Sequence, residues 1–251
     1  MRSSNYAFTM TIARRVTQQP GYILHYRPFR DSSQILEIIT RDYGKITVVA
    51  RGSRSKKSRL SGILRPFLPL RVSWSSKSNL GTLTGAESDG LSAGISGDSI
   101  FSAYYVNELL LNFLHRYDPQ PEIFILYKKI IHNLVGTSDV AKKLRSFELE
   151  LLKLLGYGVN FDHDSDSIKP LNEDLYYQYQ MEKGFVATNS TEGALVFCGK
   201  LLIGISEERF EDKNVLKAAN RFLRQIIDFH LGGKQLKSRK VLLDLHRNKI
   251  V

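Results

Sequence analysis

A run of cations is the part of this chain whose residue types and spacing most directly predict binding chemistry. Arg51, Arg54, Lys56, Lys57 and Arg59 fall within nine residues that otherwise contain only glycine and serine. Cations on a backbone of small residues can contact the phosphates of a nucleic acid whatever its base sequence. This run, called the basic loop below, predicts a polyanion partner; the alternative is a solvated charged loop without a ligand.

A second group of residues could hold a metal ion. Asp162, His163, Asp164 and Asp166 lie close together, but they lack the glycine and closing glutamate of a calcium-binding loop. We interpret them as a solvated acidic loop; a metal-dependent nuclease that uses the three aspartates is a rival interpretation. The chain contains no phosphate-binding glycine-rich loop, nucleophile elbow or zinc-protease motif. We therefore expect no enzyme, catalytic residue, metal or cofactor.

Net charge is spread unevenly along the chain. Residues 1–88 carry 15 Lys and Arg against 4 Asp and Glu, whereas residues 89–251 carry 21 of each kind. Within this second part, residues 234–251 hold six cations and one acid, which makes a second basic patch. An isoelectric point near 9.6 fits a nucleic acid as partner first and an anionic membrane surface second.

Length and composition are those of a folded protein. A chain of 251 residues can bury a sizeable core in one large domain or two to three small ones. The single cysteine, Cys198, excludes an internal disulfide and a cysteine-based zinc site. No apolar run approaches the ~20 residues that cross a bilayer, and residues 1–18 lack the apolar core of a signal peptide. We interpret residues 1–18 as a disordered leader and expect a cytoplasmic protein without a membrane partner.

The first third of the chain has the pattern of short β-strands. Five runs rich in β-branched or aromatic residues are predicted strands: 22–27, 34–40, 45–51, 68–74 and 80–86. Gly44 closes a tight turn before the third strand, and a short helical turn fits at 60–64. Five strands with a small helix between the third and fourth predict an OB-fold β-barrel over residues 19–88. A five-stranded SH3-like barrel is the alternative.

On such a barrel, the basic loop leaves the third strand. Arg27 and Arg30 flank Pro28 and Phe29 in the loop after the first strand, a loop that OB-folds use for binding. Phe29 and Tyr43 are candidates to stack on bases, as aromatic side chains do in single-strand binders; otherwise they are core residues. The barrel is therefore the predicted nucleic-acid-binding domain.

From residue 97 the apolar spacing becomes helical. Asp98 is a plausible N-cap of the first helix, and Pro121 is well placed in the first turn of the second. Further elements are expected as a helix at about 139–155, a hairpin at 175–181 and 185–188, and helices at 191–203 and 213–231. The predicted fold is α+β: the barrel, a helical domain at 97–158, a small irregular β-hairpin insertion at 159–190, and C-terminal helices with a basic tail at 191–251.

Nine short motifs in a fixed order resemble one protein family. The first four are His25-Tyr-Arg-Pro-Phe-Arg-Asp-Ser-Ser, Thr40-Arg-Asp-Tyr-Gly-Lys, Val49-Ala-Arg-Gly-Ser-Arg and Leu64-Arg-Pro-Phe-Leu-Pro-Leu. The others are Tyr105-Val-Asn-Glu-Leu-Leu, Arg145-Ser-Phe-Glu-Leu, Leu155-Gly-Tyr-Gly-Val-Asn-Phe, Glu182-Lys-Gly-Phe and Leu231-Gly-Gly-Lys-Gln-Leu-Lys-Ser-Arg. Over residues 20–240 the chain resembles the RecO family of bacterial DNA-repair proteins.

This resemblance implies a recombination mediator of the RecFOR pathway. Such a protein binds single- and double-stranded DNA, anneals complementary strands, and helps load RecA onto DNA coated by single-strand-binding protein, together with RecR. The resemblance also implies a nucleoid-associated protein that is a monomer when free. Many members hold a four-cysteine zinc site after the Leu-Gly-Tyr motif, but residues 160–190 contain no cysteine here. The chain therefore resembles the zinc-free, gammaproteobacterial branch, and the hairpin must be held by packing and hydrogen bonds.

Two sets of site residues follow from these observations. By position, Arg145 matches an arginine associated with binding the acidic, hydrophobic tail of single-strand-binding protein, and Leu149 and Leu152 could form an apolar floor beside it. The alternative is that Arg145 is a surface charge on an amphipathic helix. The expected DNA contacts are Arg27, Arg30, Arg51, Arg54, Lys56, Lys57, Arg59, Lys234, Lys237, Arg239 and Lys240. A general RNA- or ribosome-binding OB-fold protein is the rival function, which charge alone does not separate from DNA binding.

Overall fold

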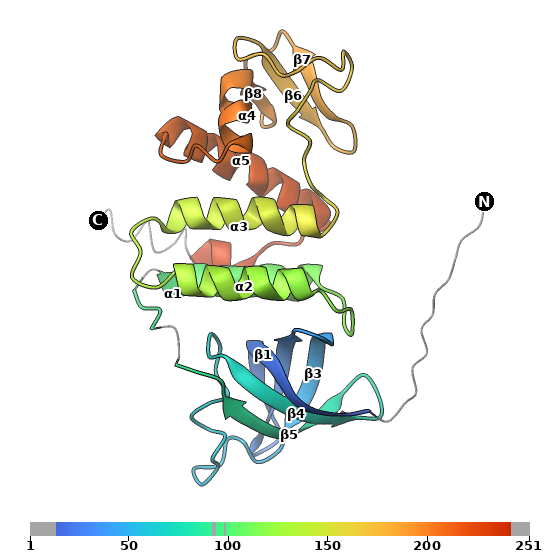
Figure 1. Cartoon of the computed structure of the whole chain (residues 1–251), viewed down its shortest axis with the longest axis vertical. Coiled ribbons are helices and arrows are strands. Elements are labelled where there is room, and N and C mark those ends of the chain that lie inside the picture. The colour runs from blue at the N-terminus through green and yellow to red at the C-terminus, as the bar shows by residue number, and fades with distance from the viewer. Residues whose placement is uncertain (1–13, 92–93, 98, 242–251) are drawn as a thin grey trace, which may run out of the picture. The chain divides into compact units, whose positions relative to one another are not determined.

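The fold is described from a computed structural model, in which residues 14–91, 94–97 and 99–241 are described (Figure 1). The chain divides into two compact units. The barrel unit comprises residues 1–93 and 107–124, and the helical unit comprises residues 94–106 and 125–251. Three expectations concern residues outside the described ranges: most of the leader, the Asp98 N-cap, and the last cations of the second basic patch, Arg247 and Lys249.

The barrel unit contains five strands in the closed order β1-β2-β3-β5-β4. They are β1 (Arg14–Phe29), β2 (Ser33–Thr40), β3 (Gly44–Ala50), β4 (Leu70–Ser76) and β5 (Gly81–Ser88). Neighbouring strands are antiparallel except β3 and β5, whose parallel pairing closes the barrel. The OB-fold-like barrel predicted from the sequence is thereby confirmed. Residues 14–18, expected in the leader, instead begin β1, because Arg14–Val16 pair with the end of β4.

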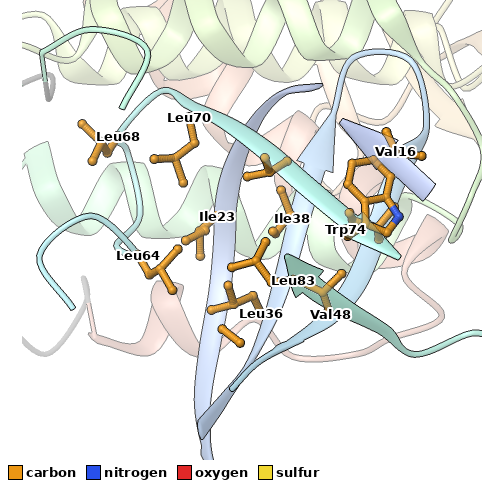
Figure 2. Close-up of a cluster of buried hydrophobic side chains, with 13 residues drawn as sticks. Val16, Ile23, Leu36, Ile38, Val48, Leu64, Leu68, Leu70, Trp74 and Leu83 are labelled. Atoms are coloured by element: carbon orange, nitrogen blue, oxygen red, sulfur yellow. The ribbon is translucent and has the colours of Figure 1, made fainter. Parts of the chain in front are cut away.

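Alternating apolar residues of the five strands fill the barrel (Figure 2). Ile23, Leu36, Ile38 and Val48 are fully buried, and Trp74 closes one end of the cluster at 2% exposure. A strand that packs on one face of a sheet needs this period of two. The barrel is therefore a filled core that offers its loops and outer surface, not its interior, to a ligand.

The connection between β3 and β4 contains the short helical turn expected at 60–64 and no longer helix. Residues 51–63 form mainly turns, in which the N–H of Ser55, Ser58 and Ser61 each donates to a carbonyl three residues earlier. At 60–64 one helical bond forms, from the N–H of Leu64 to the carbonyl of Leu60 at 3.1 Å. Serines compete with helix formation by favouring local turns, which explains why the helix extends no further here.

A later segment of the chain returns to complete the barrel unit. The Asn107 amide donates to the Leu24 carbonyl at 2.8 Å, and the Lys45 ammonium donates to the Leu111 carbonyl at 2.6 Å. Gly44 has a positive φ of 66°, as the predicted turn requires, and a Cβ there would lie 2.1 Å from the Asp118 carbonyl oxygen. Residues 107–124 are therefore part of the barrel unit although they follow it in sequence.

Five named helices and a small sheet are the main elements of the described residues after the barrel strands. The helices are α1 (Ser99–Phe113), α2 (Pro121–Asn133), α3 (Val140–Leu154), α4 (Gly199–Ser206) and α5 (Lys213–His230). The sheet has the order β7-β6-β8, with β6 (Tyr176–Gln180), β7 (Gly184–Thr188) and β8 (Val196–Cys198). Across the described residues, none of the helices is both long and apolar enough to span a bilayer.

The helix expected at 191–203 begins later than predicted. Residues 196–198 pair with β6 as a third strand, and α4 starts at Gly199. Val196 and Phe197 are buried in this pairing. Residues of these two types favour strands, which explains why they pair with β6 and do not begin the helix. A Cβ at Gly199 would lie 1.9 Å from the Asn172 carbonyl oxygen, so only glycine fits at the start of α4.

The cysteine-free insertion is held by aromatic packing and one carboxylate. Phe185, at the start of β7, packs with its ring centroid 5.6 Å from that of Phe222 on α5. The Asp164 carboxylate accepts from the N–H of Asp166 at 2.7 Å, of Ser167 at 3.2 Å and of Ala187 at 3.1 Å. One carboxylate oxygen therefore closes the loop on itself, and the other ties the loop to β7, where the resemblance would otherwise place a zinc ion with cysteine ligands. The residues present do not fit such a site.

Candidate nucleic-acid interface

The basic loop is fastened to the turn between β1 and β2. The N–H of Arg54 donates to the Ser32 carbonyl at 2.8 Å, and the N–H of Gly52 donates to the Ser33 hydroxyl at 3.4 Å. The Arg54 guanidinium lies 3.4 Å from the Arg30 carbonyl oxygen, to which it donates. These contacts follow from strand pairing, because Gln34 at the start of β2 lies opposite Ala50 at the end of β3. Two segments predicted separately thus form one surface.

The cations of this surface point into solvent. All seven predicted ones in the barrel unit are exposed: Arg27, Arg30, Arg51, Arg54, Lys56, Lys57 and Arg59. Within the described part of the chain, none of the seven pairs with a carboxylate, whereas Arg41 pairs with Asp42 at 2.9 Å. The backbone between them is a series of turns and not the flexible loop implied by small residues. The surface therefore presents charge from a fixed backbone, which suits repeated phosphate contacts.

The two aromatic candidates have different surroundings. The Tyr43 ring packs edge-on against Trp74, with ring centroids 5.3 Å apart, and lies against the barrel core. Phe29 is half-buried, and the Arg30 guanidinium carbon lies 5.2 Å from the centre of its ring. Tyr26, which sequence reasoning did not select, is 46% exposed on β1 next to Arg27. Of these three, the geometry favours Tyr26 and Phe29 as aromatics that a bound strand could reach.

Sequence reasoning also missed a groove on the barrel unit. Its volume is about 340 Å³, and its lining includes Arg15 and Lys77 with the hydroxyls of Ser75 and Thr82. None of the described residues that line it is acidic. The groove lies at the turn between β4 and β5, and Thr82 in its lining pairs with Val49 near the end of β3. Arg15 was overlooked because it was assigned to the leader, and Lys77 because it stands alone in a serine-rich turn.

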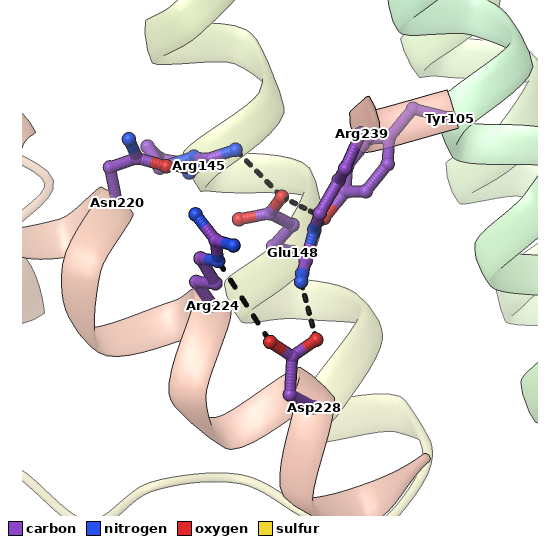
Figure 3. A network of polar contacts seen from close by, with 7 residues as sticks. All are labelled: Tyr105, Arg145, Glu148, Asn220, Arg224, Asp228 and Arg239. Atoms are coloured by element: carbon purple, nitrogen blue, oxygen red, sulfur yellow. Dashed lines mark hydrogen bonds and ion pairs between the residues drawn. The ribbon is translucent and has the colours of Figure 1, made fainter. Parts of the chain in front are cut away.

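In the helical unit, Arg145 does not have the exposed position expected of a carboxylate-binding residue. Its side chain is 10% exposed and lies 2.7 Å from the Glu148 carboxylate, and it also donates to the Asn220 side chain (Figure 3). The Tyr105 hydroxyl donates to the same carboxylate at 2.6 Å. Leu152 is 2% exposed, and Leu149 is half-buried. A bound peptide would have to replace Glu148 or Asn220 to reach Arg145.

The cations of the second basic patch fall into two groups. Lys234, Lys237 and Lys240 are exposed. The Arg239 guanidinium instead donates to Asp228, and its carbon lies 5.6 Å from the centre of the Tyr105 ring (Figure 3). Arg239 is 16% exposed in its side chain and therefore fastens residues 237–241 to α1 and α5 rather than facing DNA as expected. This pairing is not visible in the sequence, because the partner of Arg239, Asp228, belongs to another element.

The acidic segment serves the fold. Burial opposes ionisation of Asp164, but the N–H donors of Asp166, Ser167 and Ala187 outweigh it and hold the pKa below its usual range. Asp166 lies 2.7 Å from the Lys183 ammonium. In the described part of the chain, no group of three potential ligand side chains forms a metal site. Asp164 in particular has both oxygens committed to backbone, so the nuclease interpretation loses one of its three carboxylates.

Comparison with known proteins assigns a family to this fold and surface. Residues 14–89 match the family model for the N-terminal part of recombination protein O, and residues 96–240 match the model for its C-terminal part. DNA repair protein RecO of Photobacterium profundum is 40% identical over 230 residues, 92% of this chain and 97% of that protein. Its counterpart in Vibrio parahaemolyticus is 42% identical over 229 residues, 91% of this chain and 94% of that protein. The chain belongs to the RecO family of DNA repair proteins.

Proposed function

We propose that this protein is a recombination mediator that binds single- and double-stranded DNA and anneals complementary strands. Its family membership assigns it to DNA repair and recombination. The observation that carries the proposal is the joining of the basic loop to the β1–β2 turn, which sets seven exposed cations on one surface. The groove with Arg15 and Lys77 adds two further cations on the same barrel unit.

Annealing by such a protein needs no covalent chemistry. Repulsion between two phosphate backbones slows the pairing of complementary strands, and bound cations reduce it. The barrel surface would hold one strand through backbone contacts that leave the bases free to pair. Lys234, Lys237 and Lys240 of the helical unit offer separate cations for the second strand.

Salt dependence tests the barrel surface. Contacts from five to seven cations to single-stranded DNA predict that log K falls against log salt with a slope of about −3.5 to −5. Replacing Arg54, Lys56, Lys57 and Arg59 by Ala should make this slope shallower by about 2.8. The control replaces Arg41, Arg71 and Arg116, exposed cations that already pair with carboxylates, and should change the slope less. An affinity that does not depend on salt, or equal slopes in both variants, contradicts the proposal.

An RNA- or ribosome-binding protein is distinguished by competition. Single-stranded DNA and RNA of equal length and sequence both present phosphates, so the order of their affinities in the competition, and not binding alone, separates the two functions. The proposed function predicts annealing of complementary DNA strands at protein concentrations that saturate DNA binding. Preference for RNA without DNA annealing would favour the rival function.

The proposal also covers the partners of this protein and its location in the cell. We propose cooperation with RecR, help in loading RecA onto DNA coated by single-strand-binding protein, and a nucleoid-associated, cytoplasmic protein. Binding of that protein's acidic tail at Arg145, Leu149 and Leu152 would require Arg145 to exchange a partner, which its burial makes costly. The test measures annealing on DNA coated with the cognate protein, with and without its tail. Equal annealing in the two cases removes the tail from the proposal.

A further inference from the structure

An aromatic stack lies where α3 and α5 end in the helical unit. The Tyr157 and His230 rings are nearly parallel, at 16°, with their centroids 4.0 Å apart. The Phe229 ring stands edge-on to His230, with centroids 5.2 Å apart. The three residues, called the ring stack, come from the loop after α3 and from the last turn of α5.

The ring stack is open to solvent. Tyr157 is 42% exposed and Phe229 is 45% exposed. A Cβ placed at Gly156, Gly232 or Gly233 would meet no atom within 4 Å, so bare backbone borders the rings. Single exposed aromatics are common on protein surfaces, but here Tyr157 and Phe229 adjoin one another through His230 and form a contiguous patch, which is the feature typical of a binding site.

The charge around the ring stack favours an anionic strand. Residues 229–241 carry four cations and no acid. The Lys153 side chain is 74% exposed and lies 3.9 Å from the Glu150 carboxylate, and its stem lies along Gly158, next to Tyr157. Asp228 is compensated by Arg239 and lies 3.9 Å from Arg224.

The imidazole itself is suited to stacking more than to phosphate binding. Burial lowers the pKa of His230 below its usual range, while Glu182 acts in the opposite sense. His230 is therefore neutral near pH 7 and acts there as a flat ring. Glu182 is the nearby acid that a bound phosphate would oppose.

We propose that the ring stack binds an unpaired base of single-stranded DNA, which packs against Tyr157 and Phe229 while lysines of residues 229–241 contact the adjoining phosphates. This inference rests on the proposed function, since it assigns a base-binding site to a DNA-binding protein. Stacking on an aromatic ring tolerates any base, because every base has a π-face. Duplex DNA keeps its bases inside and does not use this site.

Comparison of single-stranded and duplex DNA tests the inference directly. Tyr157→Ala and Tyr157→Leu should weaken single-strand binding by about 5- to 100-fold. Duplex binding and the salt slope should not change, because no cation is removed. Tyr157→Phe should bind as the natural protein does. The control is Tyr104→Ala, which removes a tyrosine of equal 42% exposure on α1 and should leave both affinities unchanged. Thermal unfolding of each variant separates loss of binding from loss of fold.

Photocrosslinking locates the contact. An oligonucleotide carrying 5-iododeoxyuridine should crosslink to the peptide that contains Tyr157 or His230, and Glu182→Gln should raise single-strand affinity by removing the nearby acid. Equal single-strand binding by Tyr157→Ala and the natural protein overturns the inference, as does a crosslink confined to the barrel. Tyr157 variants that lose binding of an acidic tail peptide but keep DNA binding would show that the stack binds protein instead.

The same experiments separate this inference from the proposed barrel surface. If the fourfold basic-loop variant keeps its salt slope while Tyr157→Ala loses single-strand binding, the barrel surface is wrong and the ring stack stands. If the loop variant loses binding and Tyr157→Ala does not, the ring stack is wrong and the barrel surface stands.

Discussion

Arginines in the two units have opposite surroundings. In the barrel unit, Arg51, Arg54 and Arg59 reach into solvent from a backbone fixed by turns and by bonds to the β1–β2 turn. In the helical unit, Arg145 and Arg239 lie among α1, α3 and α5 and pair with carboxylates. A guanidinium that already has a carboxylate partner in a poorly hydrated site gains little by binding a phosphate.

The difference shows what decides the role of a basic residue. Arg239 belongs to a run as basic as the basic loop, and Lys237 and Lys240 lie close to it in sequence. Its partner Asp228 comes from α5, so the pairing depends on tertiary structure. The following predictions test this contrast through the free energy of unfolding, beginning with the largest change.

Loss of Arg145 should cost the most. Arg145→Ala leaves Glu148, 1% exposed, without its cation, which predicts a destabilisation of about 3–5 kcal/mol in urea unfolding. Burial already raises the pKa of Glu148, so the variant should lose further stability as pH rises and the carboxyl ionises. Adding Glu148→Gln should recover part of the loss by removing the buried charge. A cost below about 1 kcal/mol would show that the pair does not hold the helices together.

Loss of Asp164 should be the next largest effect. Asp164→Ala removes an acceptor of three N–H groups and should destabilise by roughly 2–3 kcal/mol. Because the folded pKa is lowered, the ionised carboxylate stabilises the fold above pH ~4, and this contribution disappears as pH falls below that value. The variant should therefore lose less stability on acidification. Asp166→Ala, which keeps its N–H, is the matched control, and equal pH profiles would contradict the assignment.

Arg239 and Lys240 allow a paired, mostly buried cation to be compared with an exposed one at the next position. Arg239→Ala should destabilise by about 1.5 kcal/mol, since it removes charged hydrogen bonds from a mostly buried site. Lys240→Ala should leave stability within about 0.5 kcal/mol and weaken DNA binding. Circular dichroism on heating and DNA titration of both variants make the comparison. The reverse pattern would mean that Arg239 faces the DNA.

A single change in the basic loop should have the smallest effect on stability. Arg59→Ala should change the free energy of unfolding by no more than about 0.5 kcal/mol, because its side chain is exposed. It should nevertheless make the salt slope of single-strand binding shallower by about 0.7. Titrations over a series of salt concentrations measure this value. A stability loss comparable with that of Arg239→Ala would remove the contrast between the units.

The sequence predicted the barrel well because its signals are local. Alternating apolar residues and the Arg41–Gly44 turn are visible in short windows, and both recur in the structure. The helix expected from 191 was shifted because β8 forms by pairing with β6, which no local pattern reveals. The same holds for the candidate site. The exposed cations of the basic loop can be predicted from the sequence. Arg15 could not be predicted as a site residue because its position depends on the pairing of β1 with β4, and the burial of Arg145 could not be predicted because its partner Asn220 is distant in sequence.

The discontinuous barrel unit has a consequence for the order of synthesis. The chain emerges from the ribosome with all five strands before residues 107–124 exist, yet Leu24 and Lys45 take hydrogen-bond partners from that later segment. Between them the ribosome makes residues 94–106, which belong to the helical unit. A nascent barrel therefore lacks its hydrogen bonds to Asn107 and Leu111 until α1 has been synthesised. Folding of the nucleic-acid-binding part is thus tied to translation beyond it, and a protein truncated at residue 93 would lack these bonds.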